Sequence, residues 1–72
     1  MATYQLVFTR VTGDQTSNLA DFPDDFTAVK DTMNVLSDEV TSIAIGCGSM
    51  PDVNWLGVWD YDDGTPLWVP VE

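Results

Sequence analysis

The spacing between large apolar residues changes twice along this chain, and these changes constrain the fold more than any other feature of the sequence. Residues 3–11 alternate between two faces in the period-two pattern of a half-buried β-strand. The period then lengthens to that of an α-helix, because apolar residues recur at spacings of four, three, four and three at Phe22, Phe26, Val29, Met33 and Leu36. Residues 40–47 alternate again. The sequence therefore predicts one helix, over residues 22–36, between strands.

Turn-forming residues predict the remaining strands. Thr12-Gly13-Asp14 is typical of a turn, after which residues 15–20 are predicted to return as a short, polar, edge-like strand. Residues 53–61 and 65–71 are predicted to form a hairpin, since an Asp-Gly pair lies between them. Pro66 and Pro70 have no N–H to donate, so the last strand is predicted to lie at a sheet edge.

Together these elements predict one α+β domain over residues 1–72, with the order β-β-α-β-β-β. An antiparallel sheet of four or five strands carries one α-helix packed on one face, and the other face is uncovered in a monomer. Cys47 is the only cysteine, so no intramolecular disulfide can form and packing alone must hold the domain together.

The register of the last hairpin is left open between two forms. A two-residue loop, Asp63-Gly64, places Trp59 opposite Trp68 and gathers all three tryptophans on one face. A three-residue loop, Asp62-Asp63-Gly64, instead places Trp59 opposite Leu67, and this form is slightly favoured. The difference matters because a slip of one residue exchanges the two faces of a strand.

The charge of the chain restricts its partners. Twelve Asp and Glu residues stand against only Arg10 and Lys30, with no histidine, which gives a formal net charge of -10. Direct binding to nucleic acid or to an anionic membrane is not expected, because both need Lys or Arg to neutralise phosphate. The N-terminus has no basic segment followed by a long apolar run, so neither export nor membrane insertion is predicted. With a single thiol, this predicts a cytoplasmic protein whose partner is basic.

Two groups of carboxylates are candidate partner-binding residues. Asp24, Asp31 and Asp38 recur every seven residues on the side of the predicted helix opposite its apolar stripe, with Glu39 beside them. An ordinary solvated helix face is the simpler explanation of this line, but such faces usually mix both signs of charge. Asp60, Asp62 and Asp63 form the second group, around the hairpin tip.

The second group is only partly similar to a calcium loop. Gly64 falls one position too early, and Val71 occupies the position where a bidentate Glu is needed. Turn formation accounts for these aspartates more simply. No metal and no cofactor is predicted.

Catalysis is not expected either. Without histidine, the usual Ser-His and Cys-His pairs cannot form, and Cys47 has no cation near it in sequence to activate it. Of the three tryptophans, two are predicted to fill the core, because a small domain has few other residues of that size. Trp68 is predicted to remain on the uncovered sheet face as an anchor for a partner or for a second copy of the chain.

The order of elements resembles that of a known group of proteins. The chain resembles small phage-encoded anti-CRISPR proteins in four successive parts. These are a hairpin, a helix with the stripe from Phe26-x-x-Val29 to Leu36, a strand, and the ending WLGVWDYDDGTPLWV at residues 55–69. The resemblance covers nearly the whole chain as an order of elements, and no single residue is carried over by identity. It implies an inhibitor in the cytoplasm of a bacterial host, acting on the DNA-binding surface of a CRISPR effector complex.

The acidic surface and the aromatic residues are compatible with three functions. The first is a nucleic-acid mimic, in which carboxylates occupy a basic groove that otherwise holds DNA or RNA. The second is adaptation to high salt, in which the acidity is unrelated to any partner. The third is an interaction module that uses its aromatic sheet face, including the formation of a homodimer.

Overall fold

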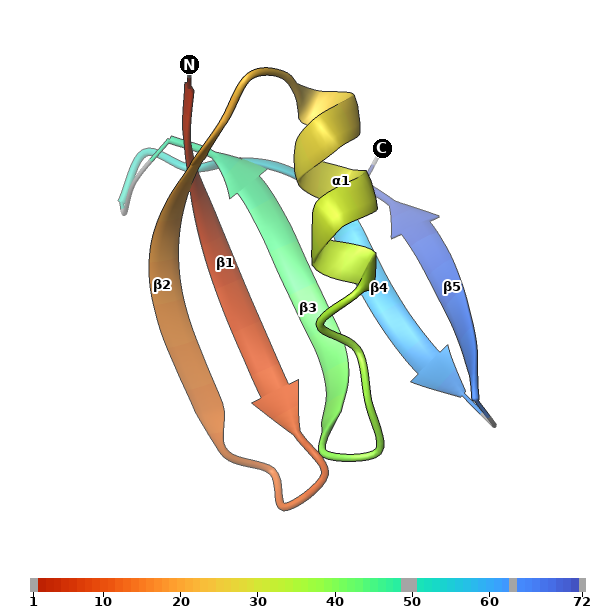
Figure 1. Ribbon diagram of the computed structural model, residues 1–72. Helices are drawn as coiled ribbons and strands as arrows, with labels where there is room; N and C mark the ends of the chain where they lie inside the picture. Colours follow the sequence, from red (N-terminus) through yellow and green to blue (C-terminus); the bar gives the residue numbers. More distant parts are fainter. Residues whose placement is uncertain (1, 49–50, 63, 72) are drawn as a thin grey trace.

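The fold is a five-stranded antiparallel sheet with one helix on one side. The computed structural model describes residues 2–48, 51–62 and 64–71. The strands run in the spatial order β2-β1-β3-β4-β5 (Figure 1). In chain order the elements are β1 (Ala2–Arg10), β2 (Gln15–Phe22), α1 (Asp25–Met33), β3 (Val40–Cys47), β4 (Asn54–Asp62) and β5 (Thr65–Pro70). The predicted fold class and element order are confirmed, as is the edge position of β2 and β5.

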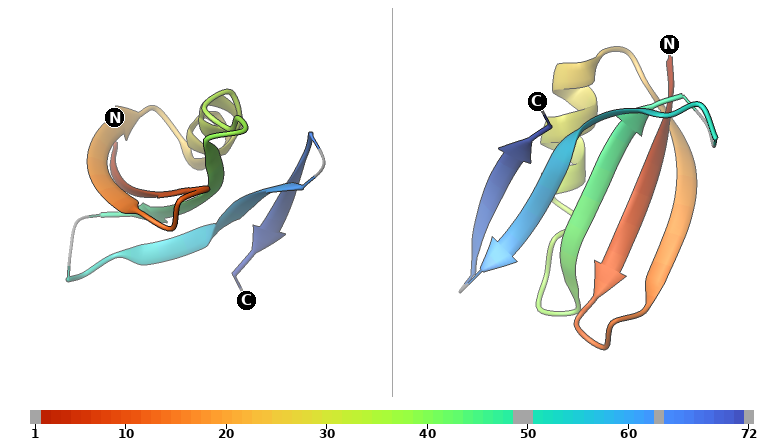
Figure 2. Two further views of the ribbon diagram at one scale, coloured as in Figure 1. Left: turned by 90° about the horizontal axis from the view of Figure 1, so that it is seen from below. Right: turned by 180° about the vertical axis from the view of Figure 1, so that it is seen from behind.

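The core lies between α1 and the middle of the sheet. Alternate residues of the central strands β1 and β3 point to the helix and are buried. Trp59 of β4 is buried with them, and so is Ala28, which is 0% exposed on the helix. The buried apolar side chains are Tyr4, Leu6, Ala28, Ile43, Ile45 and Trp59. Figure 2 shows that the sheet curls and that α1 covers only one of its faces, which we call the helix side. The opposite face, the helix-free face, is seen unobstructed from behind (Figure 2).

The helix is shorter than the apolar spacing predicts. Residues 22–36 were expected to be helical, but the helix spans Asp25–Met33. Phe22 belongs to β2, and the helix begins only after Asp24, whose side chain accepts a hydrogen bond of 2.7 Å from the Thr27 N–H. Capping by a carboxylate outweighs the apolar period because it satisfies a backbone N–H that the helix itself leaves free.

The buried face of the helix only partly matches the expected stripe, because Phe22, Val29 and Leu36 pack against the core but Phe26 and Met33 do not. Ala28 and Thr32 are 0% and 2% exposed, whereas Phe26 and Met33, which the predicted stripe placed in the core, are 74% and 36% exposed. The Thr32 hydroxyl donates to the Ala28 carbonyl at 2.8 Å, so this side chain is satisfied within the helix. Small residues four positions apart allow α1 to lie close to the sheet, and the larger side chains are displaced to one flank of the helix.

The final hairpin takes the two-residue register, so the slight preference for a three-residue loop was wrong. Trp59 lies opposite Trp68 and Asp62 opposite Thr65. Gly64 has φ +78°, a conformation that glycine adopts without steric strain. The two indole rings contact each other with centroids 5.2 Å apart. Residue 63, the other loop position, lies outside the described residues.

A bulge between β3 and β4 separates the third tryptophan from the other two. Ile45 pairs with Gly57 but Gly46 pairs with Trp55, which leaves Leu56 as an extra residue. Gly46 also pairs with Gln5 on the helix-free face, so the bulge turns Trp55 to that face. The prediction that Trp68 occupies the uncovered face was therefore wrong, because Trp68 packs with Trp59 on the helix side.

Candidate functional site

The carboxylates are displayed to solvent. Of the twelve in the chain, Asp63 and Glu72 lie outside the described residues, and the other ten are all exposed. A partner that approaches the described part of the domain therefore meets these carboxylates at its surface. The exposed residues are Asp14, Asp21, Asp24, Asp25, Asp31, Asp38, Glu39, Asp52, Asp60 and Asp62.

The predicted line of helix carboxylates does not exist as one stripe. Asp31 lies on α1, and Asp24 is its N-cap, where the hydrogen bond from the Thr27 N–H lowers the pKa of the Asp24 carboxyl. Asp38 and Glu39 lie beyond the end of the helix, in the turn before β3. In that turn the hydroxyl of Ser37 accepts a hydrogen bond from the Glu39 N–H at 3.2 Å. The periodicity failed here because the helix ends at Met33, before it reaches Asp38.

The second carboxylate group lies on the helix-free face. Asp60 pairs with Ser42 of β3, and Asp62 pairs with Thr65 of β5. These two aspartates are two residues apart in one strand, so their side chains share a face. Asp63, the third member, is outside the described residues. Asp31 and Asp60 therefore belong to two acidic surfaces on opposite sides of the sheet. Within residues 2–48, 51–62 and 64–71, no three potential metal-ligating side chains converge.

Asp25 accepts a hydrogen bond from a buried side chain that the sequence did not indicate as its partner. The hydroxyl of Tyr4 on β1 donates a hydrogen bond of 2.6 Å to Asp25, in the first turn of α1. Tyr4 is 1% exposed. The hydrogen bond to the Asp25 carboxylate, helped by desolvation, raises the pKa of Tyr4 to about 12. This contact fixes the start of α1 against the sheet.

Titration of Tyr4 tests this contact. The folded state favours the neutral phenol of Tyr4, because its pKa is raised from 10.0 to about 12. The contact with Asp25 therefore contributes stability that is fully present below pH 10.0 and is lost as the pH rises through about 12. In a Tyr61→Phe background, which leaves one tyrosine, we expect tyrosinate absorbance to appear near pH 12. The change Asp25→Ala should shift that transition to lower pH, whereas the matched Asp31→Ala, on the same helix, should not. An unchanged titration in Asp25→Ala would contradict the assignment.

An apolar groove runs along the displaced side chains of α1. Phe26, Val29, Lys30 and Met33 line it from the helix and Trp59 lines it from β4, around a volume of about 220 Å³. Trp59 is held there because its indole N–H donates to the Val29 carbonyl at 2.8 Å. The apolar spacing did not indicate this groove, because it placed Phe26 and Met33 in the core. Ala28 and Thr32, small residues four positions apart, were the available signal.

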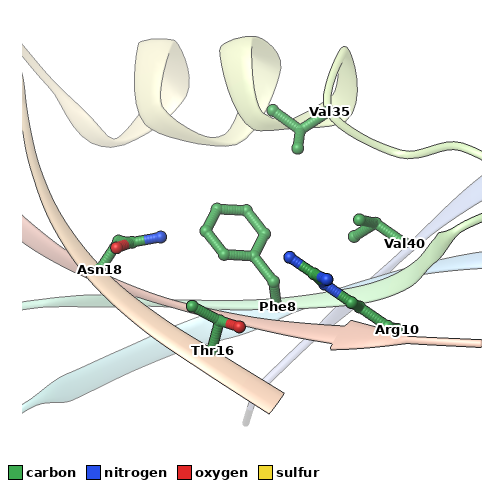
Figure 3. A pocket seen from close by; sticks show the side chains of 6 residues that line it. All are labelled: Phe8, Arg10, Thr16, Asn18, Val35 and Val40. Atoms are coloured by element: carbon green, nitrogen blue, oxygen red, sulfur yellow. The ribbon is translucent and has the colours of Figure 1, made fainter. Parts of the chain in front are cut away.

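A second pocket lies at the other side of the helix, near the outer strand β2. It has a volume of about 190 Å³, and Phe8 forms its centre (Figure 3). Its wall combines side chains of β1 and β2 with the start of β3 and the segment after α1. The lining residues are Phe8, Arg10, Thr16, Asn18, Val35 and Val40. The lining thus combines an apolar surface with one cation and two polar groups, and its volume is about that of a single large side chain.

Comparison of the chain with protein-family models, with curated proteins and with solved structures finds no match. In the described part of the chain, no helix is both long and apolar enough to cross a membrane.

Proposed function

We propose that this protein is a binding protein whose acidic surface occupies the nucleic-acid-binding surface of a basic partner. The observation that carries the proposal is the exposure of all ten described carboxylates, in a chain with only two basic residues. Such a surface repels nucleic acid and attracts the proteins that bind it. The resemblance to anti-CRISPR proteins makes a CRISPR effector complex the first partner to test.

Electrostatics explain what such a protein gains from its charge. Carboxylates facing a basic groove accelerate association and suppress binding to acidic partners. Binding of this kind weakens as salt screens the charges, as nucleic-acid binding itself does. The two acidic surfaces, with Asp31 on the helix side and Asp60 and Asp62 on the helix-free face, give two distinct ways to dock.

Charge reversal of each surface separates these two ways of docking. Variant one carries Asp31→Lys on α1, and variant two carries Asp60→Lys and Asp62→Lys on β4. Asp24 is left intact because it caps α1. The readout is competition with DNA for a purified CRISPR effector complex, at low and high salt. We expect one variant to weaken binding by about tenfold or more, since each reversal replaces an attraction with a repulsion.

Matched Asp→Asn variants at the same positions control for folding and should show intermediate binding. The proposal fails if wild-type protein does not compete with DNA for the effector or for other basic nucleic-acid-binding complexes, or if both reversals compete as well as wild type. Salt adaptation is distinguished by folding alone. A salt-adapted domain unfolds in dilute buffer, whereas a nucleic-acid mimic stays folded there and loses its partner in high salt.

The apolar groove favours a second candidate function, an interaction module that binds through α1. Phe26 is 74% exposed beside the groove that ends at Trp59. In that case partner binding persists at high salt and is lost in Phe26→Ala. Val11 is 66% exposed and does not line the groove, so Val11→Ala is the matched control.

A further inference from the structure

The two edges of the sheet differ in their capacity to accept another strand. At one edge, β5 contains Pro66 and Pro70, which have no N–H to donate. At the other edge, β2 contains no proline and no basic residue, and its first five residues, 15–19, are all exposed. Natural proteins usually protect such an edge with proline, lysine or a bulge. Among the described strands, β2 alone is an edge without these protections.

Hydrogen bonds of β1 show which backbone groups of β2 point outward. The Thr3 carbonyl accepts the Gly48 N–H at 2.8 Å on the β3 side, and the Arg10 N–H donates to the Asp14 carbonyl at 2.8 Å on the β2 side. Successive residues of a strand point their N–H and C=O groups to opposite sides, so even-numbered residues of β1 bond to β2. Since these pair with even-numbered residues of β2, the outward N–H and C=O groups belong to Gln15, Ser17, Leu19 and Asp21.

The pocket centred on Phe8 lies beside this edge. Thr16 and Asn18 of β2 line it on the helix side, opposite Val35 (Figure 3). A strand added to β2 would turn alternate side chains to the same side as Thr16 and Asn18. One of these side chains would therefore lie at the pocket. Recognition of extended peptides combines the same two features, backbone hydrogen bonds for affinity and pockets for alternate side chains.

The charge around the edge selects the chemistry of the strand. Asp14 precedes β2 and Asp21 lies near its end, and both are exposed. No Lys or Arg lies in β2 itself, and the one cation at the pocket is Arg10 of β1, which favours an uncharged side chain there. A second copy of the chain would bring a further formal charge of -10 to the same edge, which disfavours self-pairing. A segment with Lys or Arg complements it.

We infer that β2 is a docking edge, to which a basic partner adds an extended segment as a sixth strand. An apolar residue of that segment fills the pocket of Phe8 and Val35, while Lys or Arg residues on its other face approach Asp21, which pairs with Thr3. Asp14, in the turn before β2, adds to the negative charge at this edge. This inference rests on the proposed binding function and names the part of the surface that contacts the partner. It predicts a partner segment in which basic and apolar residues alternate.

The test uses a random twelve-residue peptide library selected against the wild-type protein. We expect enriched peptides to alternate Lys or Arg with apolar residues. Their affinity should fall by about tenfold or more in Ser17→Pro, which removes an outward N–H without removing a hydrogen bond to β1. Ser17→Ala keeps that N–H and is the matched control, so it should bind as wild type does. Circular dichroism shows whether each variant is folded.

Hydrogen exchange gives a readout that does not depend on a variant. Binding of an enriched peptide should slow exchange at the Ser17 and Leu19 amides. The inference is overturned if no peptide is enriched, if peptides bind Ser17→Pro as tightly as wild type, or if protection appears elsewhere. It is also overturned if wild-type protein is a dimer that Ser17→Pro converts to a monomer, because the edge is then occupied by a second copy.

The two proposals fail in different ways. If a basic complex is captured in a salt-dependent manner but Ser17→Pro captures it equally well, the docking edge is wrong and the binding function stands. If Ser17→Pro abolishes binding of peptides that carry no basic residues, and salt has no effect, the edge binds strands but the proposed function is wrong.

Discussion

Replacing Trp59 with alanine is expected to lower the free energy of unfolding by about 3–5 kcal/mol, the usual range for removing a large buried aromatic side chain. Trp59 is 8% exposed, contacts Trp68 with ring centroids 5.2 Å apart, and donates its N–H to the Val29 carbonyl. It therefore joins β4 to both β5 and α1. Because a domain of this size has a total stability of only about 5 kcal/mol, we expect the variant to be largely unfolded at 25 °C.

Urea titration followed by circular dichroism measures this loss, and two variants serve as controls. Trp59→Phe keeps an aromatic ring but loses the hydrogen bond, so it should be destabilised less than the alanine variant. Trp55→Ala removes a half-buried indole from the helix-free face, where the bulge has placed it. If Trp55→Ala were as destabilising as Trp59→Ala, the assignment of Trp59 to the centre of the core would be incorrect.

The second large effect is expected at Gly57, which faces Trp68 across the β4–β5 pair. A Cβ at this position would lie 2.6 Å from Cζ2 of Trp68 and 2.7 Å from the Val69 carbonyl oxygen. Both distances are too short, and neither the packed indole nor the backbone can move away freely. Gly57→Ala should therefore lower the free energy of unfolding by about 1–3 kcal/mol, as overpacking does in other cores.

A double-mutant cycle assigns this effect to the indole. In a Trp68→Ala background, which removes the ring but keeps the Val69 carbonyl, Gly57→Ala should be less destabilising by about 1 kcal/mol. Equal destabilisation in the two backgrounds would mean that the ring does not limit the space at Gly57. The two-residue register of the hairpin would then also be in doubt, because that register places Trp68 over this glycine.

The strands were predictable from sequence because their signals are local. Alternation at residues 3–11 and 40–47 needs no knowledge of neighbouring elements, and both segments form strands within one residue of the predicted bounds. The Asp-Gly pair located the last hairpin for the same reason. The register of that hairpin has no local signal, because both loop lengths suit the same residues. The contact between Trp59 and Trp68 decides between them.

The candidate site was less predictable than the fold. Exposure of the carboxylates follows from their charge, since burial of an ionised group is costly. Their arrangement does not, because the seven-residue spacing of Asp24, Asp31 and Asp38 forms a line only on a helix that continues past Met33. The free β2 edge, with its outward backbone groups, depends on where β2 lies in the sheet.

The sequence by itself determined the order of the elements, the absence of an intramolecular disulfide and the negative charge, because each follows from residue type and local spacing. The tertiary structure decided which side of α1 is buried, which tryptophan lies on the helix-free face and which sheet edge is free. These depend on how closely two elements approach, and that distance is set by small residues such as Ala28, Gly46 and Gly57 at the contacts. Apolar periodicity shows which apolar residues share one face of an element. Close packing between elements decides which residues of that element are buried.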